Sequence, residues 1–370
     1  MLDHIQGTAT PEGTARFADR FPRVAAGHFR KSMGLTMSSI GVGTYLGEAD
    51  RRTDELYKQS IVRAVQMGSN VIDSAINCRF QRSERAICAA LKELQKDGFR
   101  REELIVSTKA GFLSFDGEPP LDTSEYFEKQ YLNSGLLSSG EIAAGSHCIA
   151  PRYLEDQLNH SLGNLGLQTI DLFYIHNPGI RLEEIEYQHF SKRLHGAFEF
   201  LESAVGAGKI LMYGTATWNA YRSAPDFRGF LNLANIAQWA REVGGKDHHF
   251  SAIQLPYSLT MREAFALRNQ KVGDKLLSTL KAAGELVIAV MVSASMYPAR
   301  LTRNLPEFLG IHFPNLATDA QRTIQFVRST SGITSALVGM CRPRHVEENL
   351  RLVEIPLAPA NSIQTLVNAA

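Results

Sequence analysis

Eight short β-branched runs alternate with eight longer amphipathic segments along this chain, and this alternation constrains the fold more than any other feature. Strands separated by helical segments pair in parallel through right-handed crossovers. Eight such units over roughly 320 residues suit a closed (β/α)8 barrel better than an open sheet. An open sheet that binds a dinucleotide usually carries GxGxxG after its first strand, and the segment GVGTYLGEAD lacks it. We therefore predict an α/β protein with a TIM-barrel fold.

The predicted units follow one another without a composition break or a Gly/Ser linker. We expect a single domain, with a barrel and long strand-end loops at residues 35–370 and an N-terminal arm at 1–34. The expected strand–helix pairs are SSIGVG with 54–67, NVIDS with 83–96, ELIVSTK with 151–165, IDLFYIH with 190–207, ILMYGTAT with 228–243, FSAIQL with 270–283, ELVIAVMV with 318–330 and SALVGM with 343–353.

Composition and charge exclude several classes of protein. The formal net charge is +1 and 44% of the residues are hydrophobic, and no basic tail or Lys/Arg stripe indicates nucleic-acid binding. No segment reaches the roughly 18 apolar residues of a membrane span, and the start of the chain lacks signal-peptide organisation. We therefore expect a cytoplasmic protein that binds neither nucleic acid nor a membrane. The cysteines lack CxxC pairing, which favours reduced thiols; they are Cys78, Cys88, Cys148 and Cys341.

Three chemically active side chains stand at the ends of three consecutive predicted strands. These are Asp73, Lys109 and His176. In a (β/α)8 barrel the active site lies at the C-terminal ends of the strands, so the three side chains should converge. Alone, each has an ordinary explanation as a helix cap, a surface residue or a packing residue, but their joint placement favours a site. An Asp73–Lys109 pair would keep Lys109 charged, and His176 could hydrogen-bond a carbonyl oxygen that becomes an alkoxide.

No metal site is expected from the histidines and cysteines. His248 and His249 are adjacent and would point in different directions. His147 and Cys148 are also adjacent and have no partner at ligand spacing. The polar chemistry of this chain is therefore expected to be that of the strand ends.

In its motifs the chain resembles the aldo-keto reductase superfamily from about residue 35 to 355. The matching segments, in the family's order, are GVGTY, NVIDSA, STKAGF, DLFYIHNP, GKILMYGTATWN, AIQLPYSL and ALVGM followed by HVEENL. The longer contexts GTYLGEAD and AINCRFQRSERAI are similar to a bacterial branch with a long loop after the third strand. The resemblance implies a barrel that binds NADPH in extended form across the strand ends. It also implies transfer of the pro-R hydride to an aldehyde or ketone.

The resemblance assigns Asp73, Lys109 and His176 to three positions of the family's catalytic tetrad. The fourth position is a tyrosine in the family, five residues after the aspartate, and here it is Cys78. A tyrosine beside a lysine can protonate the alkoxide. A thiol has a reference pKa of about 8.5, but its one-carbon stem stops short of where a phenol hydroxyl would reach. Three ways of delivering the proton to the alkoxide stay open: through a water between Cys78 and the substrate, from His176 as the donor, or to a substrate that binds deeper.

Cys78 could also have chemistry of its own. A thiolate near Lys109 would be favoured, which would make Cys78 nucleophilic or sensitive to oxidation. Three functional hypotheses follow: a working reductase or dehydrogenase, an NADP(H)-binding barrel with little activity, or a barrel with altered, net non-redox chemistry.

A helix begins after the last predicted strand, where such barrels bind phosphate through free N–H groups and the helix dipole. Arg342, Arg344 and His345 add positive or chargeable groups there, which favours NADP(H) over NAD(H). In the family a lysine of this segment stands where the chain has Gly339. The residues expected to contact the cofactor are Gly43, Thr44, Asp73, Thr217, Gln254, Gly339, Met340, Arg342, His345, Glu348 and Asn349.

Within that set the resemblance assigns Gln254 to the nicotinamide carboxamide, and Glu348 and Asn349 to the adenine. Two positions depart from the family. Its Ser-Asn pair after the fifth strand is Ala216–Thr217 here, and the aromatic that stacks on the nicotinamide after the seventh strand is missing from the segment 290–292.

The substrate is expected to be a small carbonyl compound or alcohol. Residues 110–150 form a long excursion after the third strand, and loops of that length above a barrel are usually functional. The expected pocket residues are Tyr45, Cys78, His176 and Trp218. Aromatic residues of the loop suggest a partly aromatic pocket; they are Phe112, Phe115, Tyr126, Phe127 and Tyr131. Sugars, aromatic aldehydes and polyketide ketones all stay open, as does the oligomeric state.

Overall fold

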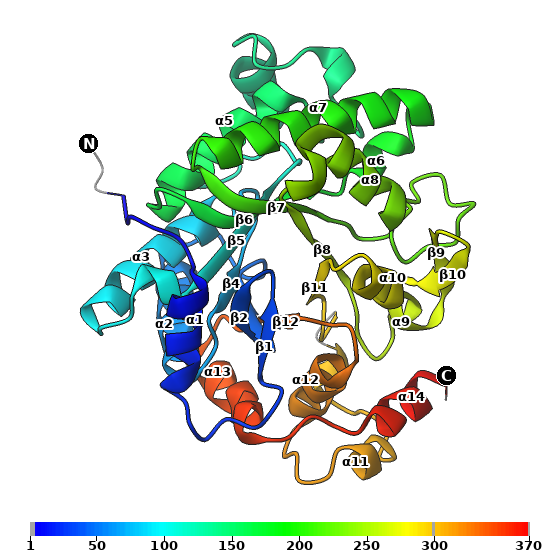
Figure 1. Cartoon of the computed structure of the whole chain (residues 1–370). Coiled ribbons are helices and arrows are strands. Elements are labelled where there is room, and N and C mark those ends of the chain that lie inside the picture. Colours follow the sequence, from blue (N-terminus) through cyan, green and yellow to red (C-terminus); the bar gives the residue numbers. More distant parts are fainter. Residues whose placement is uncertain (1–3, 298–299, 369–370) are drawn as a thin grey trace.

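Eight parallel strands form a closed barrel surrounded by helices (Figure 1). This computed structural model describes residues 4–297 and 300–368. The barrel strands hydrogen-bond in the order β11-β12-β3-β4-β5-β6-β7-β8, so neighbours in sequence are neighbours in space and the last strand meets the first. The predicted TIM barrel is therefore confirmed.

Each barrel strand is followed by one main helix. The strands are β3 (Ile40–Gly43), β4 (Val71–Asp73), β5 (Ile105–Ala110), β6 (Ile170–His176), β7 (Ile210–Ala216), β8 (Phe250–Pro256), β11 (Ala289–Ser293) and β12 (Ser335–Gly339). The helices that follow them are α2 (Arg51–Gln66), α3 (Arg82–Lys96), α5 (Pro151–Leu165), α7 (Tyr187–Gly206), α8 (Leu233–Gly244), α10 (Thr279–Glu285), α12 (Asp319–Ser329) and α13 (Pro343–Asn349).

Shorter helical segments complete the fold. Four of them are α-helical turns or short helices: α6 (Gly179–Leu182), α9 (Glu263–Ala266), α11 (Leu309–His312) and α14 (Ala360–Asn368). The 3-10 segments are η1 (Arg101–Glu103), η3 (Ser139–Glu141), η4 (Gly245–Asp247), η5 (Arg300–Thr302) and η6 (Leu350–Glu354). Within the described residues, no helix combines the length and the apolar character that a membrane crossing needs.

Alternation along the strands divides the apolar side chains between two cores. Ile72, Val106 and Phe173 belong to the large core between the barrel and its helices. Val71 and Leu172 belong to the smaller core inside the barrel. Because each parallel strand is covered on both faces, its inward-facing and outward-facing side chains are both buried, and the strand sequences are therefore continuously apolar.

An N-terminal hairpin closes one end of the barrel. It joins β1 (Phe29–Ser32) to β2 (Leu35–Ser38) and follows helix α1 (Pro11–Asp19). Leu35 and Met37 of β2 pack in the inner core against Val71 at the start of β4. The hairpin lies in front of the barrel in Figure 1, so the C-terminal ends of the strands face the other way. The hairpin formed by β1 and β2 spans the predicted boundary between residues 34 and 35. The division into an N-terminal arm and a barrel domain stays a prediction, and residues 1–3 and 369–370 lie outside the described part.

One predicted helix is largely wrong. Most of segment 270–283 forms the second hairpin, β9 (Arg268–Val272) with β10 (Lys275–Ser278), and only α10 is helical. Gly273, with φ of 56°, and Asp274 make the two-residue connection that suits a tight hairpin. Helix α8 likewise starts at Leu233, where Asn232 caps it, and not at 228.

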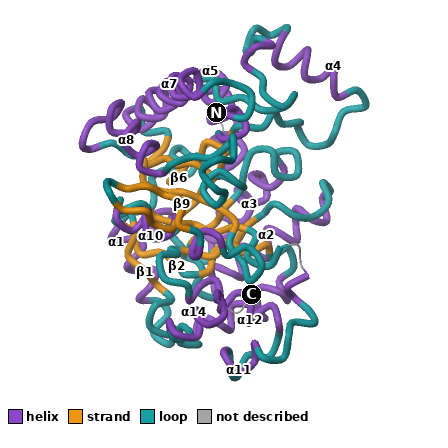
Figure 2. Tube along the Cα trace, turned by 90° about the vertical axis from the view of Figure 1, so that its right-hand side faces the viewer, coloured by secondary structure: helices purple, strands orange, loops and turns teal. Residues whose placement is uncertain are grey.

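The excursion after β5 extends away from the end of the barrel opposite β1 and β2 (Figure 2). It contains α4 (Thr123–Phe127), which continues into a π-helical turn, η2 (Glu128–Leu132). The predicted long loop is therefore present, with short helices of its own.

Candidate active site

A buried ion pair lies at the centre of the strand ends. Lys109 Nζ on β5 is 2.7 Å from Asp73 Oδ2 on β4, and the two side chains are only 6% and 9% exposed. Lys109 also donates to the Ser74 carbonyl. Asp73 Oδ1 accepts from Ser107 Oγ at 2.7 Å and from Gln254 Nε2 at 3.0 Å. The predicted Asp73–Lys109 pair is present, with both carboxylate oxygens hydrogen-bonded.

His176, at the end of β6, lies in the field of this pair. Burial, and then the charge of Lys109, lower the pKa of His176 well below its ordinary value. Its imidazole is therefore neutral near pH 7, and can donate one N–H to a carbonyl oxygen. Its Nδ1 is buried and has no hydrogen-bond partner among residues 4–297 and 300–368. The ring of Phe112 packs edge-on against it, with centroids 5.0 Å apart.

Cys78 is buried in the turn that follows β4, and the charges of Lys109 and Asp73 both act on it. Burial raises the pKa of the Cys78 thiol to about 11, and it outweighs the opposing effect of Lys109. The expectation of a favoured thiolate is therefore wrong, because the cost of burying a negative charge exceeds the attraction of the lysine. Near neutral pH Cys78 is a protonated thiol.

Alkylation of the native protein should show this directly. Since ordinary thiols have a pKa between about 8.5 and 9.0, a thiol of pKa about 11 forms at most about one hundredth as much thiolate at a pH below these values. We expect iodoacetamide at pH 7.5 to modify Cys78 at least about a hundredfold more slowly than a free peptide thiol. Mass spectrometry of the digested protein measures this rate, with Cys341, which is half-buried, as the internal comparison. Modification of Cys78 ahead of Cys341 would contradict the burial argument.

The ends of β3 and β12 bring small residues beside the ion pair. Gly43 stands in register with Asp73 on one side and with Gly339 on the other. Thr44 is buried and its hydroxyl contacts the Asp73 carbonyl oxygen at 3.2 Å and Ser74 Oγ at 2.9 Å. Gly43, Thr44 and Gly339 thus border the site, while Met340, the next residue, is fully buried in the core.

The predicted nicotinamide side lies on β7 and β8. Gln254 stands in register with Ala216, and the Thr217 N–H donates to the Gln254 carbonyl at 2.8 Å. Gln254 Nε2 is engaged with Asp73, which the sequence did not reveal. Thr217 Oγ1 is buried and has no hydrogen-bond partner in the described part of the chain. This orphaned hydroxyl fits a polar ligand group such as a carboxamide.

The residues predicted to contact the cofactor's phosphate and adenine lie on or beside helix α13. Arg342 is its N-cap and Arg344 lies in its first turn; both are exposed and neither has an ion-pair partner among the described residues. Burial, and then Arg344, lower the pKa of His345, so the positive charge here comes from the two arginines alone. Asn349 is buried, and its Oδ1 has no hydrogen-bond partner among the residues that the structure describes. The Glu348 carbonyl accepts from Gln321 Nε2 at 2.6 Å. These free charges and the orphaned oxygen fit an adenosine phosphate.

Two predicted pocket residues lie at the rim. Tyr45 is 72% exposed, and the Trp218 N–H donates to Asn177 Oδ1 at 2.7 Å. The ring of Trp218 packs edge-on against Tyr297, with centroids 5.3 Å apart. Tyr297 comes after β11, four residues past its end, so an aromatic side chain is present in the loop where the segment 290–292 offered none.

Most loop aromatics pack against one another. Phe115 stacks on Phe127 at 4.9 Å and packs edge-on against Tyr126 at 5.4 Å. Tyr131 is buried, and its hydroxyl donates to the Ser114 carbonyl at 2.7 Å. These rings form the small core of the excursion, which corrects their interpretation as pocket walls; Phe112 is the one that touches His176.

Three residues near the site were not predicted. Ser107 and Tyr174 lie two positions before Lys109 and His176, so strand alternation could have placed them inside the barrel. The Tyr174 ring centroid lies 5.8 Å from Lys109 Nζ, and its hydroxyl is buried without a partner within the described ranges. The third, His147, belongs to the excursion, and no periodic signal placed it beside His176.

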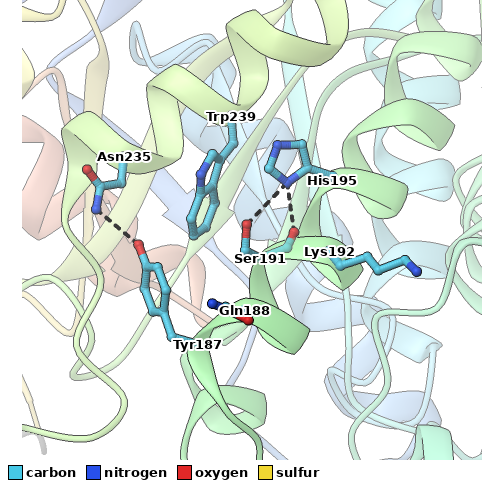
Figure 3. Close-up of a pocket in the computed structure, with 7 residues that line it drawn as sticks. All are labelled: Tyr187, Gln188, Ser191, Lys192, His195, Asn235 and Trp239. Atoms are coloured by element: carbon cyan, nitrogen blue, oxygen red, sulfur yellow. Dashed lines mark hydrogen bonds between the residues drawn. The ribbon is translucent and has the colours of Figure 1, made fainter.

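A separate depression of about 600 Å³ lies outside the barrel between α7 and α8 (Figure 3). Ser191 and His195 line it, and His195 Nε2 lies 2.9 Å from Glu242 Oε2, so the three side chains invite comparison with a nucleophilic triad. His195 Nδ1, however, is 2.8 Å from the Ser191 carbonyl oxygen and 3.5 Å from Ser191 Oγ, so it is engaged by the backbone and does not activate the hydroxyl. The depression contains none of the predicted site residues; its lining is Tyr187, Gln188, Ser191, Lys192, His195, Asn235 and Trp239.

All four cysteines are free thiols. Within residues 4–297 and 300–368, no group of three or more His, Cys, Asp or Glu side chains is arranged to hold a metal ion.

The sequence of this chain is similar to those of known proteins. The family model described as "Aldo/keto reductase family" matches residues 39–290. A curated protein of Schizosaccharomyces pombe, named as a candidate beta subunit of a voltage-gated potassium channel, is 23% identical over 353 residues, which is 90% of this chain and 89% of that protein. An NADH-specific methylglyoxal reductase of Escherichia coli is 26% identical over 147 residues, covering 38% and 39% of the two chains.

Solved structures share the whole fold at low sequence identity. The holo form of an aldo-keto reductase from Bacillus halodurans is 18% identical, with a TM-score of 0.62 and coverage of 92% of this chain and 96% of that one. An aldo/keto reductase from Klebsiella pneumoniae in complex with NADP and acetate is 16% identical, with a TM-score of 0.61 and coverage of 94% and 95%. At such identities the likeness shows the fold alone.

Proposed function

Because the chain belongs to the aldo/keto reductase family, a family of oxidoreductases, we propose that it is an NADP(H)-dependent enzyme acting on a carbonyl/alcohol pair of a small or medium organic substrate. The observation that carries the proposal is the buried Asp73–Lys109 pair beside a neutral His176 at the strand ends. A cation, a neutral hydrogen-bond donor and a water-poor surrounding are what a developing alkoxide requires.

The proposed roles of the residues follow from their contacts. When bound, the cofactor supplies or accepts the hydride. Lys109, whose Nζ lies 2.7 Å from Asp73 Oδ2, stabilises negative charge at the substrate oxygen. Neutral His176 donates its N–H to that oxygen and fixes the carbonyl. Polar groups of the cofactor would be held by Gln254, Thr217 and Asn349. The side-chain amide of Gln254 also donates to Asp73.

The proton is the open step of this mechanism, because Cys78 stands where the family has tyrosine. As a protonated thiol Cys78 holds a proton, yet its short stem favours delivery through a water. Donation by His176 and a substrate seated deeper are the other two routes. Each leaves the hydride step unchanged and alters only the source of the proton.

We propose NADP(H) over NAD(H) because Arg342 and Arg344 are exposed and unpaired among the described residues at the start of α13. A guanidinium can bind a 2′-phosphate through charge-assisted hydrogen bonds. The name of the Klebsiella structure includes NADP, whereas the partial Escherichia coli relative is named NADH-specific. Since the names of these two proteins point in different directions, our proposal of NADP(H) depends on Arg342 and Arg344.

Removal of one arginine tests this preference. The unmodified protein should bind NADPH more tightly than NADH, and Arg342→Ala should narrow the gap by about tenfold, the value of one charge-assisted contact near 1.4 kcal/mol. Fluorescence titration with each cofactor measures both affinities. Arg351→Ala, an exposed arginine of η6 near the chain's end, is the matched control and should leave the gap unchanged. Equal affinities in the unmodified protein would contradict the 2′-phosphate assignment.

An NADP(H)-binding barrel with little reductase activity, or with net non-redox chemistry, is the second candidate function. The observation that favours it is the buried Cys78 with its raised pKa, since the position of the family's tyrosine then holds neither a phenol nor a thiolate. Titration with NADPH followed by a carbonyl screen for loss of absorbance at 340 nm distinguishes the two. Steady turnover supports the reductase, and tight binding without turnover on any carbonyl supports the second candidate.

The same proposal places the protein in the cytoplasm with small molecules as its only inferred ligands. Four free thiols are compatible with a reducing compartment. Fractionation of the native cells with a tagged chain tests the placement.

A further inference from the structure

The excursion after β5 returns to the barrel beside His176. Its two ends pair through the backbone: the Leu113 N–H donates to the Ser146 carbonyl at 2.7 Å and the Cys148 N–H to the Gly111 carbonyl at 2.7 Å. Phe112 and His147 face each other in this short antiparallel bridge. His147 is therefore fixed where the excursion both begins and ends.

The side chain of His147 reaches the catalytic histidine directly. His147 is fully buried, and its Nε2 lies 2.6 Å from the His176 carbonyl oxygen. Burial lowers the pKa of His147 to about 4, so near neutral pH the ring is neutral. Only the tautomer with the proton on Nε2 can donate to a carbonyl, which fixes the tautomer. Gly111 leaves the room for this contact, since a Cβ there would stand 2.4 Å from the His176 oxygen.

Phe112 provides a second link between the two histidines. Its ring packs edge-on against His147, with centroids 5.1 Å apart, and edge-on against His176 at 5.0 Å. The Phe112 carbonyl accepts from the Tyr153 hydroxyl at 2.7 Å, which ties this residue to α5. His176 Nδ1 has no hydrogen-bond partner within the described chain, so packing against Phe112 and the backbone contact of His147 are the contacts that orient the ring.

We propose that His147 is a positioning residue, which holds the His176 backbone and, through Phe112, its ring at the angle needed for donation to the substrate oxygen. The excursion and the catalytic centre are then coupled, because any shift of the excursion's closing bridge moves His176. This inference rests on the proposed function for its catalytic consequence, while its structural part stands on the contacts alone.

A matched set of substitutions tests the contact. His147→Gln keeps an N–H at about the reach of Nε2, whereas His147→Leu fills the space and leaves the His176 carbonyl without its donor. His28→Leu is the control, because His28 is also fully buried with Nε2 2.9 Å from a carbonyl oxygen, that of Gly68, at the other end of the barrel. A purely structural histidine would affect stability in the same way as His28 does.

Two readouts follow His176 itself. In protein labelled with 15N-histidine, the ring resonances of His176 should shift in His147→Leu and stay in place in His147→Gln and His28→Leu. On the carbonyl that the protein turns over, kcat of His147→Leu should fall about tenfold to a hundredfold, as for a misplaced catalytic group, with unchanged NADPH affinity. His147→Gln should recover most of that loss.

The resonances decide the inference even if no carbonyl is turned over, so its failure is separable from failure of the proposed function. Unmoved His176 resonances in His147→Leu would overturn it. If His147→Leu does not fold, His147→Gln decides: a native circular dichroism spectrum with His176 resonances in place supports the inference, and a native spectrum with displaced resonances overturns it.

Discussion

Lys109→Met is expected to abolish turnover and to lower the free energy of unfolding by about 3–5 kcal/mol, the cost of breaking a buried ion pair from one side. The pair is nearly sealed from water, with Lys109 6% and Asp73 9% exposed at the side chain. Without Lys109, Asp73 keeps hydrogen bonds from Ser107 and Gln254 but loses its ion-pair partner. Urea unfolding followed by circular dichroism measures the loss.

Two comparisons separate the charge from the lost packing. Lys109→Met combined with Asp73→Asn removes the uncompensated carboxylate and should recover part of the stability while activity stays absent. Lys275→Met breaks the Lys275–Glu285 pair, which has a similar length of 2.9 Å but is 61% and 46% exposed, and should cost less than about 1 kcal/mol. Equal effects of Lys109→Met and Lys275→Met would show that the inner pair is solvated.

The barrel was predictable because its signal is repeated. Each parallel strand is buried on both faces and each following helix on one, so eight apolar runs and eight amphipathic segments recur in order. The error at 270–278 came from a local turn: Gly273 and Asp274 reverse the chain between two short strands, which pattern reading assigned to a helix.

The site was predictable where strand ends determine it. Asp73, Lys109 and His176 follow from the rule that parallel strands place their C-terminal ends together. Protonation of Cys78 did not follow, because the resemblance implies that Cys78 lies near Lys109 but not how deeply it is buried, and burial dominates its pKa. His147 lies 29 residues from His176 in a loop, and no periodicity encodes where a loop returns.

Cys78→Tyr is expected to reduce simple aldehydes at least about tenfold faster than the parent, equivalent to about 1.4 kcal/mol of barrier. The change places a phenol hydroxyl beside Lys109, which is paired with Asp73, and close to the neutral imidazole of His176. A phenol near a lysine can transfer its proton to the alkoxide directly, so the water that Cys78 would need is no longer required. Steady-state oxidation of NADPH with a small aldehyde measures the gain.

Because Cys78 is buried, a larger side chain must displace its neighbours, and the controls must separate this effect from proton donation. Cys78→Phe adds the same ring without the hydroxyl, so a gain limited to Cys78→Tyr belongs to the phenol. Cys78→Ala removes the thiol and shows whether the parent's activity depends on it. If Cys78→Tyr binds NADPH yet gains nothing on any carbonyl, while Cys78→Ala abolishes a parent activity, the thiol has chemistry of its own, and the reductase function would have to be withdrawn in favour of the second candidate.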